Sequence, residues 1–259
     1  MPEERLTKNQ RREQARELAR KEREKAQRRE RLTKILVPVI VVVALIAVAV
    51  TTTVIIVNQP KPAPIAANGP KNMISDGIVF TGQNGTIVAT KTAALTKGET
   101  PTPVPTDTSA GAPIHITTYI DWACPYCKAF EQANSAYIQK LVESGAAVLQ
   151  VMPVAIVDRS YQSSRYASRA NNAAACVANY DPDQFLAVQQ TFYNDQPAEG
   201  TSGLTNSQIA TLVKNAGVND DKVTACINGE SFKNWVVSAT QRALADPTIQ
   251  GPQGFGTPT

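Results

Sequence analysis

Cysteine and histidine are both scarce in this sequence, which contains four cysteines and a single histidine, His115. Four cysteines in 259 residues are too few for a fold that depends on a disulfide framework. A structural zinc site needs four ligands, usually as two pairs of Cys or His at short spacing. Only Cys124 and Cys127 are close together, whereas Cys176, Cys226 and His115 are scattered. We therefore expect no metal site, and no other cofactor is indicated.

The main part of the chain also lacks a basic excess. The whole chain has a net charge of +4, but residues 1–34 alone carry thirteen Lys or Arg against seven Asp or Glu. Residues 35–259 are therefore net −2, whereas nucleic-acid binding typically requires a basic surface. We expect no nucleic-acid partner. Residues 1–34, with few apolar side chains, are typical of a solvated helix of mixed charge.

One long apolar run is present, Ile35–Val57, with 23 residues and no charge. A helix of this length, at about 1.5 Å per residue, crosses a hydrocarbon core of roughly 30 Å. The charged region before it is too long for a cleaved signal peptide. The basic residues place the N-terminus in the cytoplasm and residues 58–259 outside, where disulfides persist. We predict a single-pass anchor in the cell membrane.

Proline-rich stretches separate the remaining parts of the chain. Between them, two short apolar runs flank Asn84-Gly85, a pattern typical of a β-hairpin. The predicted organisation is a cytoplasmic charged helix at 1–34, a transmembrane anchor at 35–57, a Pro-rich linker at 58–75, a β-hairpin segment at 76–97, a Pro/Thr-rich linker at 98–113 and a main domain at 114–259.

The main domain begins with Ile114–Ile120, whose β-branched and apolar residues predict a central strand buried on both faces. Two cysteines follow, and then Lys128–Ser144 in a helical pattern that ends at Gly145. Ala147–Met152 is the next predicted strand. A strand, a helix and a second strand in this order predict a βαβ unit, and hence an α/β fold.

A helical block occupies roughly residues 158–246. Asp181–Gln184 and Thr205–Gln208 each have the pattern of a capping box at a helix start. We found no internal repeat.

The closely spaced cysteines form the sequence Cys124-Pro125-Tyr126-Cys127. Thiol-disulfide exchange needs an attacking thiolate and a second thiol that resolves the mixed disulfide. At a helix start, unpaired amides and the helix dipole stabilise the Cys124 anion, and Cys127 lies one turn later. Pro125 lies where a missing N–H costs little, and Pro125 and Tyr126 are the inner residues that tune the redox potential. Half of a zinc site and an inert disulfide are the alternatives.

The segment Tyr119–Glu131, reading YIDWACPYCKAFE, resembles the active-site segment of DsbA-like thiol:disulfide oxidoreductases of the thioredoxin superfamily. The resemblance covers about residues 114–259. It implies a thioredoxin-like fold with a helical insertion, followed by a cis-proline loop that Gly254–Pro258 resembles. By this resemblance, Cys124 is the nucleophile, Cys127 the resolving thiol, and Thr257 and Pro258 form the loop that faces the disulfide and binds substrate.

The resemblance has two further implications. Cys176 and Cys226 match a second, structural disulfide of actinobacterial-looking members of the family, and two independent buried thiols are the alternative. Family members continue past the cis-proline into two strands and a helix, whereas this sequence ends at Thr259. We therefore expect the chain to be a fragment of a longer protein.

The function implied is disulfide exchange outside the cytoplasm, most simply the donation of disulfides to exported cysteine-containing proteins, with a membrane or soluble redox partner that resets the thiols. A reductase or isomerase, or a non-catalytic membrane-tethered binding module, remains the alternative. Among the neighbouring residues, Asp121 and Glu131 are expected to be caps or surface charges. We expect His115 to be a satisfied structural histidine and Trp122 to shield the disulfide, contact substrate or simply pack.

Overall fold

The computed structural model describes residues 20, 21, 25, 34, 61–105 and 107–259. The chain divides into two compact units, Met1–Gln59 and Pro60–Thr259. The four described residues of the first unit are helical, and the predicted anchor Ile35–Val57 lies outside the described residues. Within the described part of the chain, every helix is too short or too polar to cross a membrane.

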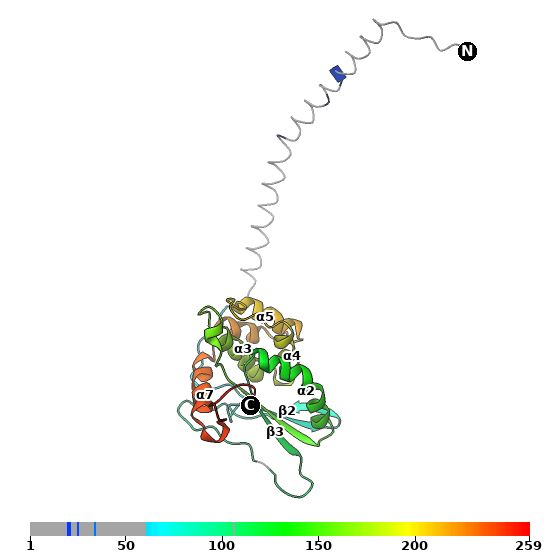
Figure 1. The fold of residues 1–259 in the computed structure, drawn as a ribbon, viewed down its shortest axis with the longest axis vertical. Coiled ribbons are helices and arrows are strands. Elements are labelled where there is room, and N and C mark those ends of the chain that lie inside the picture. Colours follow the sequence, from blue (N-terminus) through cyan, green and yellow to red (C-terminus); the bar gives the residue numbers. More distant parts are fainter. Residues whose placement is uncertain (1–19, 22–24, 26–33, 35–60, 106) are drawn as a thin grey trace, which may run out of the picture. The chain divides into compact units, whose positions relative to one another are not determined.

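A four-stranded sheet organises the second unit (Figure 1). Its strands are β1 (Ile78–Gln83), β2 (Thr86–Ala89), β3 (Ile114–Ile120) and β4 (Ala147–Pro153). They lie in the order β2-β1-β4-β3, with β1 antiparallel to both its neighbours and β3 parallel to β4. Helix α2 (Pro125–Glu143) connects the two parallel strands, which confirms the predicted βαβ unit.

The hairpin is part of this sheet. Its turn lies at Asn84-Gly85, where both residues have positive φ, and Ile78 and Phe80 of β1 pair with β4 and are buried. An isolated two-stranded hairpin is marginally stable in water, so β1 gains both pairing and burial from β4. Residues 76–97, which the sequence indicated as a separate segment, thus belong to the same unit as the main domain.

Strand β3 lies at the edge of the sheet, and the prediction of a central strand buried on both faces is wrong for the described residues. Ile114 at its start is 63% exposed, whereas Ile120 at its end is buried. On the free side of β3, Tyr119 exchanges backbone hydrogen bonds with Thr259, of 2.8 and 3.2 Å. An apolar sequence shows that a strand packs against something, but it does not show on how many sides the strand is paired.

The segment after residue 60 is irregular yet packed. Ala63 N–H donates to Ala225 O at 2.8 Å, and Met73 is fully buried. Gly229 lies so close to Ala63 that a Cβ at this position would overlap the Ala63 backbone. Residues 61–75 therefore follow the surface of the helical region, although their composition is that of a linker.

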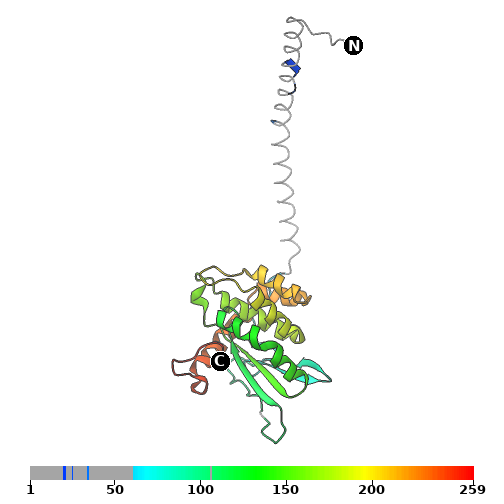
Figure 2. The same cartoon turned by 45° about the vertical axis from the view of Figure 1, so that its right-hand side comes forward.

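Five helices form the insertion between β4 and the C-terminal segment: α3 (Tyr166–Tyr180), α4 (Phe185–Asn194), α5 (Asn206–Asn215), α6 (Asp221–Asn228) and α7 (Lys233–Ala245). Short 3-10 turns lie at Asp158–Ser160, Pro182–Gln184 and Pro247–Ile249. Figures 1 and 2 show α3, α4 and α5 grouped beyond one end of the strands. The alanine-rich α3 is buried over most of its length and contacts the other four helices, so it is the centre of the insertion.

The two predicted capping boxes have different outcomes. Thr205 and Gln208 form theirs at the start of α5, each side chain accepting the backbone N–H of the other. Asp181 makes no side-chain cap, because the chain enters α4 through the 3-10 turn Pro182–Gln184 instead of a regular first helical turn. The prediction of a box at this second position is wrong.

An aromatic cluster joins the sheet to the insertion and supports the loop that carries the two neighbouring cysteines. Trp122, two residues after β3, is fully buried and meets Phe185 and Phe192 of α4 edge to face. Phe185 also packs against Phe80 of β1. Buried aromatic pairs of this kind favour one arrangement of the elements that carry them. The loop from β3 to α2 is therefore anchored on α4, which in turn packs against β1.

Candidate active site

Cys124 occupies the N-cap position of α2. Its backbone is extended, with φ −85° and ψ 121°, and its N–H donates to Asp121 O at 3.0 Å. Pro125 is the first residue of the helix, where its missing N–H has no partner to lose. The N–H groups of Tyr126 and Cys127 donate towards the Cys124 sulfur, so this sulfur lies at the positive end of the helix dipole.

The two cysteines are free thiols that differ in exposure. Cys124 is 4% exposed, Cys127 is fully buried, and Tyr126 between them is 77% exposed. A partner protein that approaches the start of α2 therefore meets Tyr126 and the edge of Cys124, but it cannot reach Cys127.

The segment Thr257-Pro258 lies against Cys124. Its peptide bond is cis, and Cys124 Sγ lies 3.5 Å from Thr257 O. The Thr257 hydroxyl is buried and has no hydrogen-bond partner among the described residues. The structure thus brings together residues separated by 133 positions in the sequence.

The two thiols are perturbed in opposite directions. A hydrogen bond from Cys127 lowers the pKa of Cys124 to about 5, and the nearby Thr257 side chain and the N–H groups of the first helical turn add to this effect against the opposing effect of burial. The pKa of Cys127 is raised, first by its hydrogen bond to Cys124 and then by burial. Cys124 is therefore the thiolate at neutral pH, and Cys127 carries the proton.

Asp121 is a fully buried carboxylate in the same loop, and neither a surface charge nor a helix cap. Its carboxylate accepts N–H groups from Ala123 at 2.9 Å, Ile156 at 2.8 Å and Val157 at 3.1 Å. Burial raises the pKa of Asp121 to about 7, and these three donors only partly offset that rise. Asp121 thus connects the active-site loop to the segment that follows β4.

Three residues of the helical region that the sequence did not reveal also contact this loop. Tyr161 donates to Ala123 O at 2.8 Å, Gln196 donates to Trp122 O at 2.8 Å and Cys124 O at 3.1 Å, and Tyr193 donates to Asp121 O at 3.5 Å. These side chains lie 38 to 74 positions from their acceptors. No local pattern marks them, because ordinary Tyr and Gln residues acquire this role only through the fold.

The remaining candidates near the cysteines have structural positions. Trp122 packs in the aromatic cluster and does not cover the sulfurs from outside. Glu131 of α2 is buried, which raises its pKa, so its expected role as a cap or surface charge is wrong. The Nε2 of His115 has no hydrogen-bond partner among the described residues, so His115 is not the satisfied histidine that we expected.

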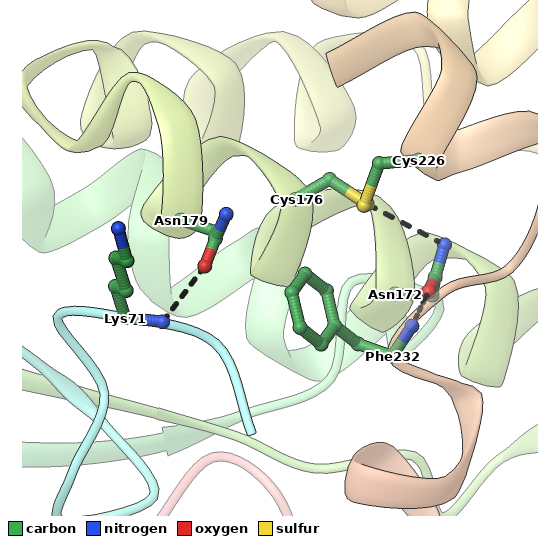
Figure 3. Close-up of a disulfide and its surroundings, with 6 residues drawn as sticks. All are labelled: Lys71, Asn172, Cys176, Asn179, Cys226 and Phe232. Atoms are coloured by element: carbon green, nitrogen blue, oxygen red, sulfur yellow. Dashed lines mark hydrogen bonds between the residues drawn. A yellow bond between two sulfur atoms is a disulfide. The ribbon is translucent and has the colours of Figure 1, made fainter. Parts of the chain in front are cut away.

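The second cysteine pair, Cys176 of α3 and Cys226 of α6, forms a disulfide across the helical insertion (Figure 3). Both residues are buried, as are the alanines around Cys176. Asn172 donates weakly to the Cys176 sulfur at 3.8 Å and accepts the Phe232 N–H at 2.8 Å. On the same helix, Asn179 accepts the Lys71 N–H at 2.9 Å, which fixes the irregular N-terminal segment to α3.

Over the residues that the structure describes, no cluster of three or more His, Cys, Asp or Glu could hold a metal ion.

Comparison with known proteins places this arrangement among related folds. A family model described as Thioredoxin matches residues 108–254, more than half of the chain. No curated protein matches the chain. The crystal structure of reduced DsbA from Mycobacterium tuberculosis is 27% identical, with a TM-score of 0.51, over 67% of this chain and 79% of that chain.

Two more solved structures share the fold at lower identity. MdbA, a thiol-disulfide oxidoreductase from Corynebacterium diphtheriae, is 16% identical with a TM-score of 0.50, over 76% of this chain and 85% of its own. MdbA from Corynebacterium matruchotii is 15% identical with a TM-score of 0.50, over 72% of this chain and 87% of its own. At this level of identity, the likeness concerns the fold alone.

Proposed function

The chain belongs to the thioredoxin family, and from that premise we propose that it is a protein thiol:disulfide oxidoreductase whose Cys124–Cys127 pair donates disulfides to exported proteins. The similarity to reduced DsbA supports the reaction class, because it extends over most of both chains. The observation that carries the proposal belongs to this chain itself. Two neighbouring thiols at one helix start have pKa values shifted in opposite directions, so one is a thiolate and the other a protonated thiol.

The reaction follows from the positions of the two sulfurs. In the oxidised protein, a client thiolate attacks Sγ of Cys124, which forms a mixed disulfide and breaks the Cys124–Cys127 bond. The electron pair of that bond leaves with Cys127, which takes up a proton. A second client thiolate attacks the client sulfur of the mixed disulfide, and Cys124 leaves as a thiolate. The client has then lost two electrons and two thiol protons, and the pair is reduced.

The low pKa of Cys124, about 5, supports the donating direction. A thiol with a low pKa is a good leaving group in the second step, and a stabilised thiolate makes the reduced form favourable. Both effects favour disulfide transfer to the client. Two inner residues, Pro125 and Tyr126, tune this balance, since they define the first turn of α2 on which the thiolate depends.

Thr257 and Pro258 supply the surface on which a client lies beside Cys124. The Thr257 carbonyl oxygen is 3.5 Å from Cys124 Sγ, and the backbone that leads to Thr257 is not part of a regular strand. An extended peptide can pair with such backbone through its own N–H and C=O groups. This contact holds the client cysteine near Sγ of Cys124 and does not depend on the side chains of the client.

The site of action in this proposal is outside the cytoplasm. It rests on Ile35–Val57 as an anchor in the cell membrane and on the basic residues that precede it. Exported cysteine-containing proteins are then the clients, and a membrane or soluble redox partner reoxidises the pair after each cycle. An alkaline phosphatase reporter fused after residue 70 should be active, and activity of a cytoplasmic reporter at the same position would contradict this topology.

The reduction potential tests the direction of transfer. Equilibration with glutathione buffers should give a midpoint less negative than about −180 mV, as expected for a disulfide donor, whereas a value near about −270 mV would indicate a reductase. Oxidation of a reduced client should proceed with the wild type and stop with Cys124→Ala. A wild-type protein that binds clients but transfers no disulfide would instead be a non-catalytic binding module.

A further inference from the structure

Side chains of the helical insertion and its preceding loop bind every backbone carbonyl of the active-site loop from Asp121 to Cys124. The Tyr193 hydroxyl donates to Asp121 O and the Tyr161 hydroxyl to Ala123 O. The Gln196 side chain donates to both Trp122 O and Cys124 O. Four consecutive carbonyls therefore have side-chain partners from one region of the chain, and two of them also have backbone donors: Asp121 O accepts the Cys124 N–H and Cys124 O accepts the Lys128 N–H of α2.

Gln196 has a special place among these donors. Its single Nε2 bridges Trp122 O at 2.8 Å and Cys124 O at 3.1 Å, which lie on either side of the peptide that leads into the nucleophile. The residue is half-buried in the connection between α4 and α5, and its side chain makes no other hydrogen bond within the described residues. The carbonyl of Pro197, the next residue, accepts a hydrogen bond from the Tyr161 hydroxyl at 3.1 Å, so Tyr161 also holds the segment that carries Gln196.

We propose that Gln196 is a positioning residue that sets the reactivity of Cys124, by holding the carbonyls of Trp122 and Cys124 away from the thiolate and the amides of α2 towards it. This inference rests on the proposed exchange reaction. It assigns to the helical insertion a role in the chemistry, because the insertion supplies the donor that orients the loop.

The physical argument concerns two carbonyl dipoles. A carbonyl oxygen carries partial negative charge, and a buried one without a donor turns towards any available N–H. The nearest such groups are the first amides of α2, which stabilise the Cys124 anion. Gln196 supplies the donor that Trp122 O otherwise lacks among the described residues and a second donor to Cys124 O beside the Lys128 N–H, so the first amides of α2 stay with the sulfur.

An isosteric substitution tests the donor without removing the packing. Gln196→Met keeps the length of the side chain and deletes the N–H, and Gln196→Glu replaces the donor with an acceptor. The matched control is Gln190→Met, on the exposed face of α4. Alkylation of Cys124 by iodoacetamide across pH reports its thiolate fraction, and thermal melting reports folding.

We expect Gln196→Met to raise the apparent pKa of Cys124 and slow its alkylation at acidic pH by about threefold to tenfold. Gln196→Glu should slow it further, and Gln190→Met should leave it unchanged. The other groups that interact electrostatically with Cys124, among them Asp121, Tyr161 and Tyr193, are intact in all three variants, so the shift reports the lost amide.

A variant of a second donor, Tyr161, provides an independent test if the Gln196→Glu protein does not fold. Tyr161→Phe removes the hydroxyl that binds Ala123 O and Pro197 O and should shift the alkylation profile in the same direction. Folded Gln196→Met and Tyr161→Phe proteins with wild-type profiles would overturn the inference. That result differs from failure of the proposed function, in which the wild type itself shows no acidic thiolate and no exchange.

Discussion

The two cysteine pairs of this chain are chemically alike but lie in opposite environments. Cys124 and Cys127 lie at a helix start, where amides of α2 and the Thr257 carbonyl surround the outer sulfur. Cys176 and Cys226 join two helices of the insertion, and the one side-chain hydrogen bond to their sulfurs among the described residues comes from Asn172, at 3.8 Å. The first pair has donors that stabilise a thiolate, and the second has a disulfide in apolar packing. The environment of a cysteine, more than its spacing, decides between exchange and structural support.

The largest effect on exchange is expected when either cysteine of the reactive pair is replaced. Cys124→Ser should reduce exchange to the uncatalysed background, because the only thiolate accessible to a client is lost. Cys127→Ser, mixed with a client that already contains a disulfide, should instead accumulate a mixed disulfide, because the Cys124 thiolate opens the client disulfide and no Cys127 thiol remains to resolve it. Non-reducing electrophoresis with a cysteine-containing client measures both outcomes. Trapping through Cys127 in the Cys124→Ser protein would reverse the assigned roles.

The structural pair should show the opposite result. Joint replacement of Cys176 and Cys226 by Ala should lower the stability by about 3 to 5 kcal/mol in the chain-entropy model, since the disulfide closes a separation of 50 residues. Exchange by the protein that remains folded should be unchanged. Denaturant unfolding and the client oxidation assay provide the two measurements. Lost exchange at full stability would mean that this pair also takes part in the reaction.

The pH dependence of stability distinguishes the reduced from the oxidised protein. Because the pKa of Cys124 is lowered from 9.0 to about 5, its thiolate contributes stability above pH about 9, which is lost as the pH falls through about 5. The oxidised protein has no such contribution, since its Cys124 does not titrate. Asp121, whose pKa is raised to about 7, acts oppositely in both forms and lowers stability as the pH rises from about 4 to about 7.

Unfolding of both redox forms at several pH values should therefore show a gap in the free energy of unfolding. The gap favours the reduced protein and widens from about pH 5 to about pH 9. Asp121 contributes to both curves and its pKa is raised mainly by burial, so most of its contribution cancels in the difference between them. The Cys124→Ser protein, which cannot form the disulfide, should follow the pH dependence of the oxidised wild type. A gap that stays constant over this range would contradict the low pKa of Cys124.

The smallest expected effect concerns Tyr126. Its ring is 77% exposed, so Tyr126→Ala should change stability by no more than about 0.5 kcal/mol. If Tyr126 tunes the pair, the reduction potential should nevertheless shift. Tyr137→Ala is the matched control, because Tyr137 is on the same helix and 66% exposed but lies three turns from the cysteines. Equal potentials in both variants would leave Tyr126 without a tuning role.

Much of the site was accessible from sequence because its elements are local. β3, the two cysteines and α2 follow one another along the chain, so hydrophobic pattern, Pro125 and the Cys spacing predict their order. The resemblance added Thr257 and Pro258. Thr257 is 133 positions from Cys124 in the sequence, and its carbonyl oxygen lies 3.5 Å from Cys124 Sγ. The pattern failed where pairing decides the outcome, as for β3 at the sheet edge and the hairpin beside β4. Strand order depends on long-range pairing, which an apolar run does not encode.

The sequence by itself determined the α/β class, the βαβ unit, the helix that begins at the reactive cysteines and the helical character of residues 158–246. Each follows from short-range rules of periodicity and helix capping. Only the tertiary structure decided that Asp121 is buried and that Tyr161 and Gln196 bind the carbonyls of the active-site loop. Burial and hydrogen bonding between distant segments are properties of the packed chain. For that reason, the helical insertion acquires its contact with Cys124 only when the protein folds.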